Sequence, residues 1–82
     1  MDYALVTLFF PRLNRREDME LPARMLISEL TESIILSLKK YDSGSFGYIE
    51  ALTLKCDGKI LNRDLTLADY RIWDGSVIEA KG

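Results

Sequence analysis

Side chains able to do acid–base chemistry or to bind a metal occur mainly where the chain should turn. The sequence contains no histidine, the side chain that most readily serves as a general base near neutral pH. Aspartates could take that role or bind a metal, and the candidates are Asp57, Asp64, Asp69 and Asp74. Aspartate is common in turns because its carboxylate accepts hydrogen bonds from nearby backbone amides, so we interpret these residues as turn formers.

Two other features resemble reactive motifs. Cys56 is the only cysteine, so it cannot form a disulfide within the chain and fits a reducing compartment. A reactive thiol needs exposure and nearby cations, but strand alternation directs Lys55 to the opposite face, so Cys56 is predicted to be a small core residue. Gly44 and Gly47 lack the strand–loop–helix setting of a phosphate-binding loop. We therefore expect a protein that is not an enzyme and that uses no cofactor or metal ion.

Length and charge narrow the class further. A chain of 82 residues is predicted to form a single domain, residues 1–82. The formal net charge of −2 argues against nucleic acid as a main partner. No apolar run is long enough to cross a membrane, and the first residues lack the basic segment of a signal peptide. We therefore expect a cytoplasmic protein.

The first residues are predicted to form a hairpin. Residues 3–10 are rich in the β-branched and aromatic side chains that are typical of a strand. Pro11 should end this strand, because proline cannot donate a hydrogen bond to a neighbouring strand. After a polar turn at residues 12–17, residues 18–21 alternate between acidic and apolar side chains, as a second, antiparallel strand would.

A helix is predicted from residue 26 to residue 40. Its apolar residues recur at i, i+3, i+7 and i+11 along one face, and they are Ile27, Leu30, Ile34 and Leu38. Met25 and Leu26 provide no side-chain oxygen that could cap the first amide groups, so the sequence does not identify what satisfies them.

The second half of the chain is predicted to contain short strands joined by turns. A loop at residues 42–50, with Phe46 between two glycines, should lead into a strand at residues 51–56. Asp57-Gly58 between two apolar runs predicts a two-residue hairpin turn. The remaining elements expected are a return strand at 59–61, a helical turn at 66–69, a corner at 70–72, a turn at Asp74-Gly75 and a last strand at 76–80.

The order of these elements, β-β-α-β-β-β, places one helix with an apolar face against a sheet with an apolar face. This predicts an α+β fold of the β-grasp type, in which a mixed sheet packs on one helix. The residues expected in its core are Val6, Leu8, Met19, Leu21, Ile27, Leu30, Ile34, Leu38, Leu52, Leu54, Leu61, Leu67, Ile72 and Ile78.

The closing part of the chain carries a Gly-Lys turn at Gly58-Lys59 and a Thr-Leu-x-Asp-Tyr-x-Ile corner at 66–72. In this pairing it resembles ubiquitin and its relatives. The matching residues are Gly58, Lys59, Leu61, Thr66, Leu67, Asp69, Tyr70 and Ile72. The resemblance implies that the Tyr70 ring packs under the corner and that its hydroxyl group holds a backbone group. It also implies that Lys55, Glu79 and Lys81 replace the apolar patch through which ubiquitin is recognised, so receptors selecting that patch should not bind.

A series of short motifs runs through the N-terminal half from Val6-Thr7-Leu8 to Glu29-Leu30. In this series the chain is most similar to the EsaB/YukD family, the ubiquitin-like proteins of bacterial type VII secretion. That family tends to show a Val-Thr-Val-like strand, a proline, basic residues, an Asp-Leu-x-Leu-Pro-Ala segment and Glu-Leu in the helix. The corresponding residues are Val6-Thr7-Leu8, Pro11, Arg12, Arg15 and Arg16, Asp18 to Ala23, and Glu29-Leu30, and the run Leu67–Gly75 also suits the family. The missing helix cap and the aromatic loop around Phe46 depart from the pattern.

The resemblance implies a non-enzymatic interaction or regulatory module, an accessory component of a type VII secretion system. Its partner would be a cytoplasmic domain of a secretion-system membrane component, which would recruit it to the inner face of the cell membrane, or a second copy in a homodimer. Ubiquitin and related sulfur carriers end in a Gly-Gly tail, whereas Lys81-Gly82 follow the last strand here, so we do not expect conjugation. The alternatives are a protein modifier or sulfur carrier, and a ubiquitin-like domain excised from a larger membrane secretion component.

Exposed apolar side chains are the candidate partner-binding residues. Leu5 and Phe9 should lie on the face of the first strand opposite the core residues, and together they are the leading candidate. The other candidates are Leu36 on the outer side of the helix, Trp73 beside a turn, and the arginines Arg12, Arg15 and Arg16. A basic cluster would steer the chain toward acidic protein or lipid. The alternatives are ordinary exposure of single apolar residues and a solvated basic turn.

Overall fold

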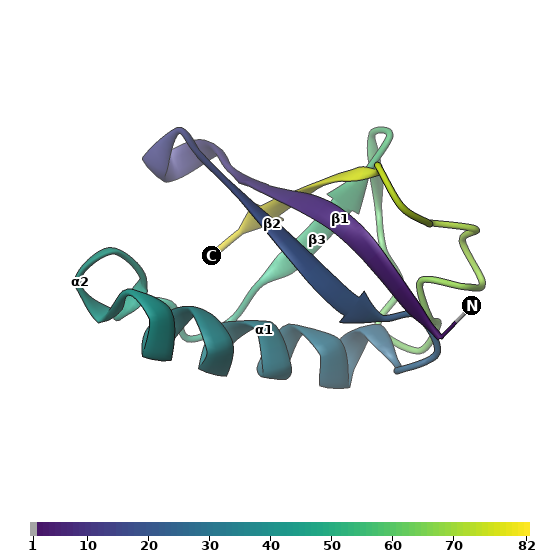
Figure 1. Cartoon of the computed structure of the whole chain (residues 1–82), viewed down its shortest axis with the longest axis horizontal. Coiled ribbons are helices and arrows are strands. Elements are labelled where there is room, and N and C mark those ends of the chain that lie inside the picture. Colours follow the sequence, from purple (N-terminus) through teal and green to yellow (C-terminus); the bar gives the residue numbers. More distant parts are fainter. Residues whose placement is uncertain (1) are drawn as a thin grey trace.

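The computed structural model describes residues 2–82, and its strands form a mixed five-stranded sheet crossed by α1 (Figure 1). The elements in chain order are β1 (Tyr3–Phe10), the 3-10 helix η1 (Pro11–Leu13), β2 (Arg15–Pro22), α1 (Ile27–Tyr41), α2 (Ser43–Phe46), β3 (Thr53–Cys56), β4 (Lys59–Ile60) and β5 (Val77–Lys81). The strands lie in the order β2-β1-β5-β3-β4. β1 is antiparallel to β2 and parallel to β5, while β3 is antiparallel to both β4 and β5. The predicted β-grasp fold is confirmed.

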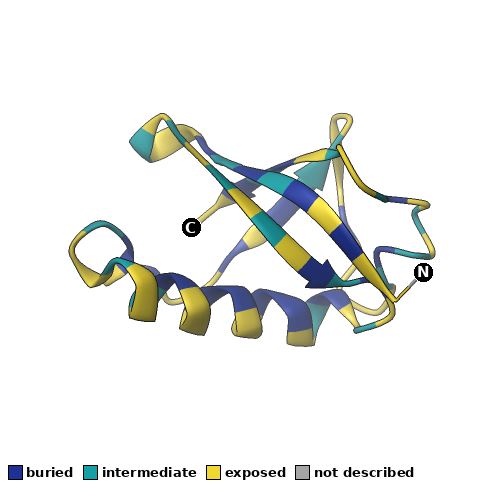
Figure 2. Cartoon of the chain, in the orientation of Figure 1, coloured by how far each residue is buried: buried dark blue, intermediate teal, exposed yellow. Residues whose placement is uncertain are grey.

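The core lies between α1 and the inner face of the sheet, which we define as the face that α1 covers. Figure 2 shows the buried side of α1 turned toward the strands. The predicted core residues are buried with the exception of Met19, which is half-buried because β2 lies at the edge of the sheet. Burying an aliphatic side chain of this kind contributes about 1.5–3 kcal/mol before conformational entropy is counted.

The backbone of a distant segment caps the N-terminus of α1. The amide of Ile27 donates to the carbonyl of Leu65 at 2.8 Å, and the amide of Ser28 donates to the carbonyl of Arg63 at 3.0 Å. These bonds replace the side-chain cap that neither Met25 nor Leu26 can supply. The segment before the corner is therefore tied directly to the start of the helix.

The segment predicted as a loop at residues 42–50 contains the short helix α2. The Asp42 carboxylate caps it by accepting a hydrogen bond from the Ser45 amide at 3.2 Å. Phe46 at its end is fully buried, and its ring centroid lies 5.1 Å from that of Phe10. Phe46 and Ile49 thus close one end of the core, a role the sequence did not reveal because buried loop residues follow no periodic spacing.

Several element boundaries also differ from the prediction. The turn between β1 and β2 is shorter than expected, because Asn14 adopts a positive φ of 48° and lets β2 begin at Arg15. Cys56 is half-buried at the end of β3 and packs against the core instead of lying within it. No helix forms at residues 66–69 of the described chain. Instead, the Thr66 amide donates to the Asp69 carboxylate at 2.9 Å and the Asp69 amide donates to the Thr66 hydroxyl oxygen at 3.1 Å, which closes a turn.

Two predicted pieces of local structure are confirmed. Asp57 and Gly58 have φ values of 51° and 80°, the positive values that a two-residue hairpin turn requires. Tyr70 packs against the core, and its hydroxyl oxygen accepts a hydrogen bond from the amide of Asn62 at 2.7 Å. Tyr70 thereby holds the corner against the chain that enters it.

Candidate interaction surface

The outer face of the sheet, which α1 leaves uncovered, carries Leu5 and Phe9 as predicted. Alternation along β1 buries Val6 and Leu8 and leaves Leu5 52% exposed and Phe9 half-buried. The Asp74–Gly75 turn fixes the position of Leu5, because the Asp74 carboxylate accepts from its amide and the Gly75 amide donates to its carbonyl. Leu5 is therefore an exposed side chain whose backbone is held by two hydrogen bonds.

Phe9 is partly covered by an arginine from the neighbouring strand. Arg16 lies opposite Phe9 in the β1–β2 register, and its guanidinium carbon lies 4.9 Å from the centre of the Phe9 ring. On the other side, Phe9 neighbours Glu79 of β5, which in turn neighbours Lys55 of β3. A cation above the ring and a carboxylate beside it form a polar boundary around one aromatic side chain.

Two further apolar side chains lie on this outer face, and the sequence analysis did not single them out. Val77 neighbours Thr7 across the parallel pair and is 48% exposed. Ile60 of β4 pairs with Lys55 and is 67% exposed. The prediction that Ile78 lies in the core already implied that the Val77 side chain points to the outer face, because side chains alternate along a strand. Ile60 gave no such signal, since β4 has only two residues.

The three arginines do not form the single cluster that the sequence suggested. Arg12 stacks on the ring of Tyr48, Arg15 on Phe46 and Arg16 on Phe9, at 4.9–5.1 Å from each ring centre. Because β2 begins at Arg15, alternation sends Arg15 to the inner face and Arg16 to the outer face. Only Arg16 lies beside Phe9 in the β1–β2 register.

Leu36 and Trp73 lie apart from each other. Leu36 is 65% exposed on the side of α1 that faces away from the sheet. Trp73 is half-buried and precedes the turn that binds the backbone of Leu5. The structure therefore brings the segment of Trp73 next to the Leu5 end of β1 and leaves Leu36 on another side of the molecule.

Two of the four aspartates interpreted as turn formers use their carboxylates as predicted, whereas at Asp64 the backbone amide donates to the Asn62 side chain. Asp69 and Asp74 accept hydrogen bonds from backbone amides, and Asp57 occupies a hairpin turn. Within residues 2–82, no group of three or more His, Cys, Asp or Glu side chains is placed to hold a metal ion. Burial, with a smaller contribution from Asp57, raises the pKa of the Cys56 thiol, which makes it a weaker nucleophile near neutral pH.

None of the helices in the described residues is long and apolar enough to span a membrane. The exposed or half-buried apolar side chains described on the outer face of the sheet are Leu5, Phe9, Ile60 and Val77. The architecture described above is the ubiquitin-like fold.

Comparisons with solved structures give the same fold. The chain is similar to the ubiquitin-like domain of the Mycobacterium tuberculosis type VII secretion system protein ECCD1, with 21% identity, a TM-score of 0.76 and full coverage of both chains. It is similar to the EccD5 ubiquitin-like domain from Mycobacterium xenopi, with 18% identity, a TM-score of 0.77 and coverage of 99% of this chain and 94% of that one. A chain of the MycP5-free ESX-5 inner membrane complex matches at 17% identity and a TM-score of 0.77, over 98% of this chain and 21% of that one. No protein-family model and no curated protein matches the sequence.

Proposed function

We propose that this chain is a non-enzymatic ubiquitin-like interaction module of a bacterial type VII secretion system, an accessory component of the EsaB/YukD kind. It acts at the cytoplasmic face of the membrane by binding a protein of the secretion complex. The observation that carries the proposal is the similarity, over the whole chain, to the ubiquitin-like domains of ECCD1 and EccD5. The EsaB/YukD pattern in the sequence, from Val6 to Leu30, supports the same assignment.

The contact surface in this proposal is the outer face around Leu5 and Phe9. Interfaces are commonly centred on an aromatic anchor that is surrounded by polar groups, and Phe9 has Arg16 above its ring and Glu79 beside it. At the corresponding positions for ubiquitin recognition, Lys55 and Glu79 are charged, so a receptor specific for an apolar patch there would have to bury charged side chains. The partner is therefore expected to be selective for this chain.

The proposal is tested by cross-linking in the bacterium that produces the protein. A tagged full-length chain is cross-linked in cells, and its adducts in the membrane fraction are identified by mass spectrometry. We expect a membrane component of the type VII system among them, and we expect the double variant Leu5→Ser/Phe9→Ser to lose that adduct. Its thermal unfolding must first show that the fold is retained.

Leu36→Ser is the matched control, because Leu36 is also an exposed leucine but lies on the side of α1 that faces away from the sheet. It should cross-link as the wild type does. Loss of the adduct in this variant and its retention in the Leu5/Phe9 variant would transfer the contact to α1. Wild-type protein with no adduct to any secretion component, and unimpaired secretion in a strain lacking the gene, would contradict the proposed function.

A further inference from the structure

β2 has a free hydrogen-bonding edge, because it is the outermost strand next to β1. The amide of Ala23 donates to the carbonyl of Asp2 at 2.8 Å, which makes these opposed residues a hydrogen-bonded pair. In an antiparallel ladder such pairs recur at every second residue. The backbone groups of Arg16, Asp18 and Glu20 therefore face away from β1, where an added strand could bond to them.

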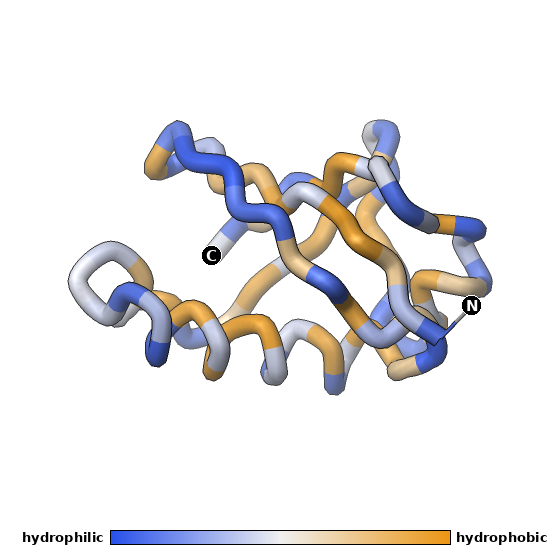
Figure 3. The backbone as a smooth tube through the Cα atoms, viewed as in Figure 1, coloured by the Kyte–Doolittle hydropathy of each residue, from blue (hydrophilic) through white to orange (hydrophobic). Residues whose placement is uncertain are grey.

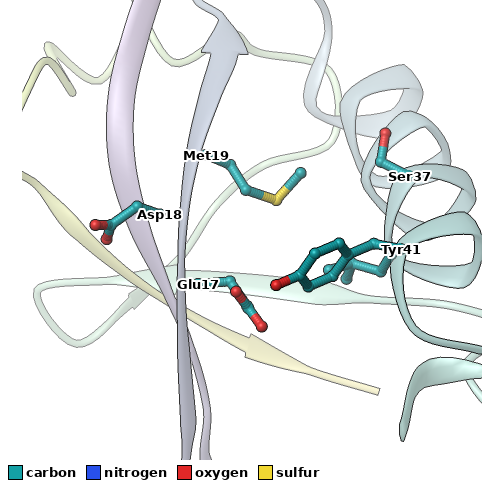
Figure 4. A pocket seen from close by; sticks show the side chains of 6 residues that line it. Glu17, Asp18, Met19, Ser37 and Tyr41 are labelled. Atoms are coloured by element: carbon teal, nitrogen blue, oxygen red, sulfur yellow. The ribbon is translucent and has the colours of Figure 1, made fainter. Parts of the chain in front are cut away.

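A groove lies between this edge and α1. It encloses about 330 Å³ and is lined by Glu17, Asp18, Met19, Ser37, Leu38 and Tyr41. Figure 4 shows Met19 and Tyr41 directed into the gap from opposite sides, with Asp18 on the far side of the strand. Leu38 is buried, whereas Tyr41 is 70% exposed. The groove thus has an apolar floor and an accessible aromatic wall beside an unpaired strand edge.

The charges along this edge are mainly negative. Glu17, Asp18 and Glu20 lie within four consecutive positions. The continuous hydrophilic stretch that Figure 3 shows over the first half of β2 also contains Arg15 and Arg16. Arg16 turns to the outer face over Phe9. Arg15 lies 2.7 Å from Glu17 and 2.9 Å from Asp42, so one guanidinium faces two carboxylates. The edge therefore favours a positively charged ligand.

We propose that β2 binds an extended basic peptide segment, which adds to the sheet as a sixth strand. Its backbone bonds to Arg16, Asp18 and Glu20, one apolar side chain enters the groove between Met19 and Tyr41, and its flanking lysine or arginine residues lie beside Asp18 and Glu20. Strand addition obtains affinity from backbone hydrogen bonds and specificity from a pocket for every second side chain. The groove lies on the α1 side of the sheet, whereas the Leu5 and Phe9 side chains lie on the outer face, although Glu20 and Arg16 are their cross-strand neighbours. The groove therefore does not depend on the proposed secretion role.

A second copy of β2 fits this edge poorly. Two copies of β2 could pair as antiparallel strands related by a two-fold axis, with both helices on the same face of the joined sheet. Odd-numbered residues then oppose odd-numbered ones and even oppose even, and the residue on the axis opposes the same residue of the other copy. Centring on Arg15, Arg16, Glu17, Asp18 or Glu20 opposes two identical charges, and centring on Met19 opposes Asp18 to Glu20. Centring on Leu21 opposes Glu20 to Pro22, which cannot donate a backbone hydrogen bond. Like charges directly opposed destabilise a strand pair, so the charge pattern selects a basic partner over self-pairing.

The probe is the synthetic peptide Gly-Lys-Val-Lys-Val-Lys-Gly, titrated into the isotope-labelled full chain and followed by NMR. We expect the largest amide shifts at residues 16–20 of β2 and at Ser37 and Tyr41 of α1. The acidic counterpart Gly-Glu-Val-Glu-Val-Glu-Gly should bind at least tenfold more weakly. In the cross-linking experiment above, Tyr41→Ala should keep the wild-type adduct, because Tyr41 lines the groove and not the outer face, and this separates the peptide site from the proposed secretion contact.

Tyr41→Ala removes the aromatic wall, and Leu36→Ala is the matched control because Leu36 is also an exposed α1 residue. We expect Tyr41→Ala to weaken binding about tenfold, the effect of losing one interface anchor, and Leu36→Ala to leave it unchanged. Two further peptides test the backbone hydrogen bonds, one N-methylated on the odd-numbered amides and the other on the even-numbered amides. Only one of these two sets of amides can donate to β2 in an added strand. One set should abolish binding and the other should preserve it.

Three results would overturn the proposal. The first is a set of shifts spread over acidic residues of other surfaces, such as Glu29 and Asp64, with none at Tyr41. The second is an equal effect of Tyr41→Ala and Leu36→Ala. The third is an equal effect of the two N-methylated peptides, which would mean that the peptide is held by charge alone and adds no strand.

Discussion

Arg15 connects three parts of the chain that are distant in sequence. Its guanidinium stacks 4.9 Å from the centre of the buried Phe46 ring and forms ion pairs with Asp42 and Glu17. The hydrogen bond from Arg15, followed by those from Ser45, lowers the pKa of the Asp42 carboxyl below its ordinary value. Arg15 therefore joins the start of β2 to the α1–α2 junction. The ion pair with Asp42 that makes this link requires the Asp42 carboxylate to be ionised.

This arrangement predicts an acid-sensitive contribution to stability. Because the folded pKa of Asp42 is depressed, the contribution is fully present above the ordinary aspartate value of 3.8 and is lost as the pH falls through the lower folded value. Unfolding free energies measured against pH should show Asp42→Asn less stable than wild type at neutral pH, with the difference shrinking below about pH 4. Asp64→Asn, at an exposed turn, serves as the control. A difference between wild type and Asp42→Asn that does not change with pH would contradict the prediction.

Cys56 gives a second prediction at this scale. Its thiol is half-buried and has a raised pKa, mainly because burial disfavours the charged thiolate. Alkylation requires the thiolate, so the rate of reaction with iodoacetamide should rise with a midpoint above the ordinary pKa of 9.0. The same measurement on the denatured chain provides the reference. A native midpoint equal to or below the denatured one would show that the side chain is activated and not merely packed.

At the scale of elements, α1 was the most predictable part of the chain and the α2 region the least. A stripe of four apolar residues with helical spacing fixed which side of α1 faces the sheet, and Ile34 and Leu38 are buried as expected. Phe46 and Ile49 have no such repeat, and their burial depends on how the chain folds back over Phe10. The sequence did not show that the three arginines stack on three different rings. Their placement depends on the residue at which β2 begins, which in turn depends on the left-handed conformation of Asn14.

The phase of α1 has a direct mutational test. Ile34 is 1% exposed and Leu36 is 65% exposed. Truncating a buried Ile or Leu to Ala costs about 2–5 kcal/mol, whereas an exposed substitution usually changes stability by about 0.5 kcal/mol or less. Denaturant unfolding of Ile34→Ala should therefore show a much lower midpoint than that of Leu36→Ala. Equal midpoints would mean that the helix is rotated relative to the sheet described here.

At the scale of the whole molecule, β5 joins two halves that are far apart in sequence. It lies between β1 and β3 and pairs with both. Its inward residues, Ile78 and Ala80, are 0% and 2% exposed. The hairpin of β1 and β2 therefore meets the hairpin of β3 and β4 only through the last strand, which explains why the core needs nearly the full length of the chain.

Shortening the chain to residues 1–75 should consequently unfold all of it and not only its end. Without β5 the sheet separates into two two-stranded hairpins, and an isolated hairpin is at best marginally stable in water. Amide hydrogen exchange should show loss of protection throughout α1 and β1. Two full-length variants serve as controls: Ile78→Ala, at a fully buried position, should be destabilised by about 2–5 kcal/mol, and Val77→Ala, on the outer face, should remain folded. Persistent protection of α1 in the shortened chain would show that the first hairpin and the helix form a stable unit without β5, which contradicts the central role assigned to this strand.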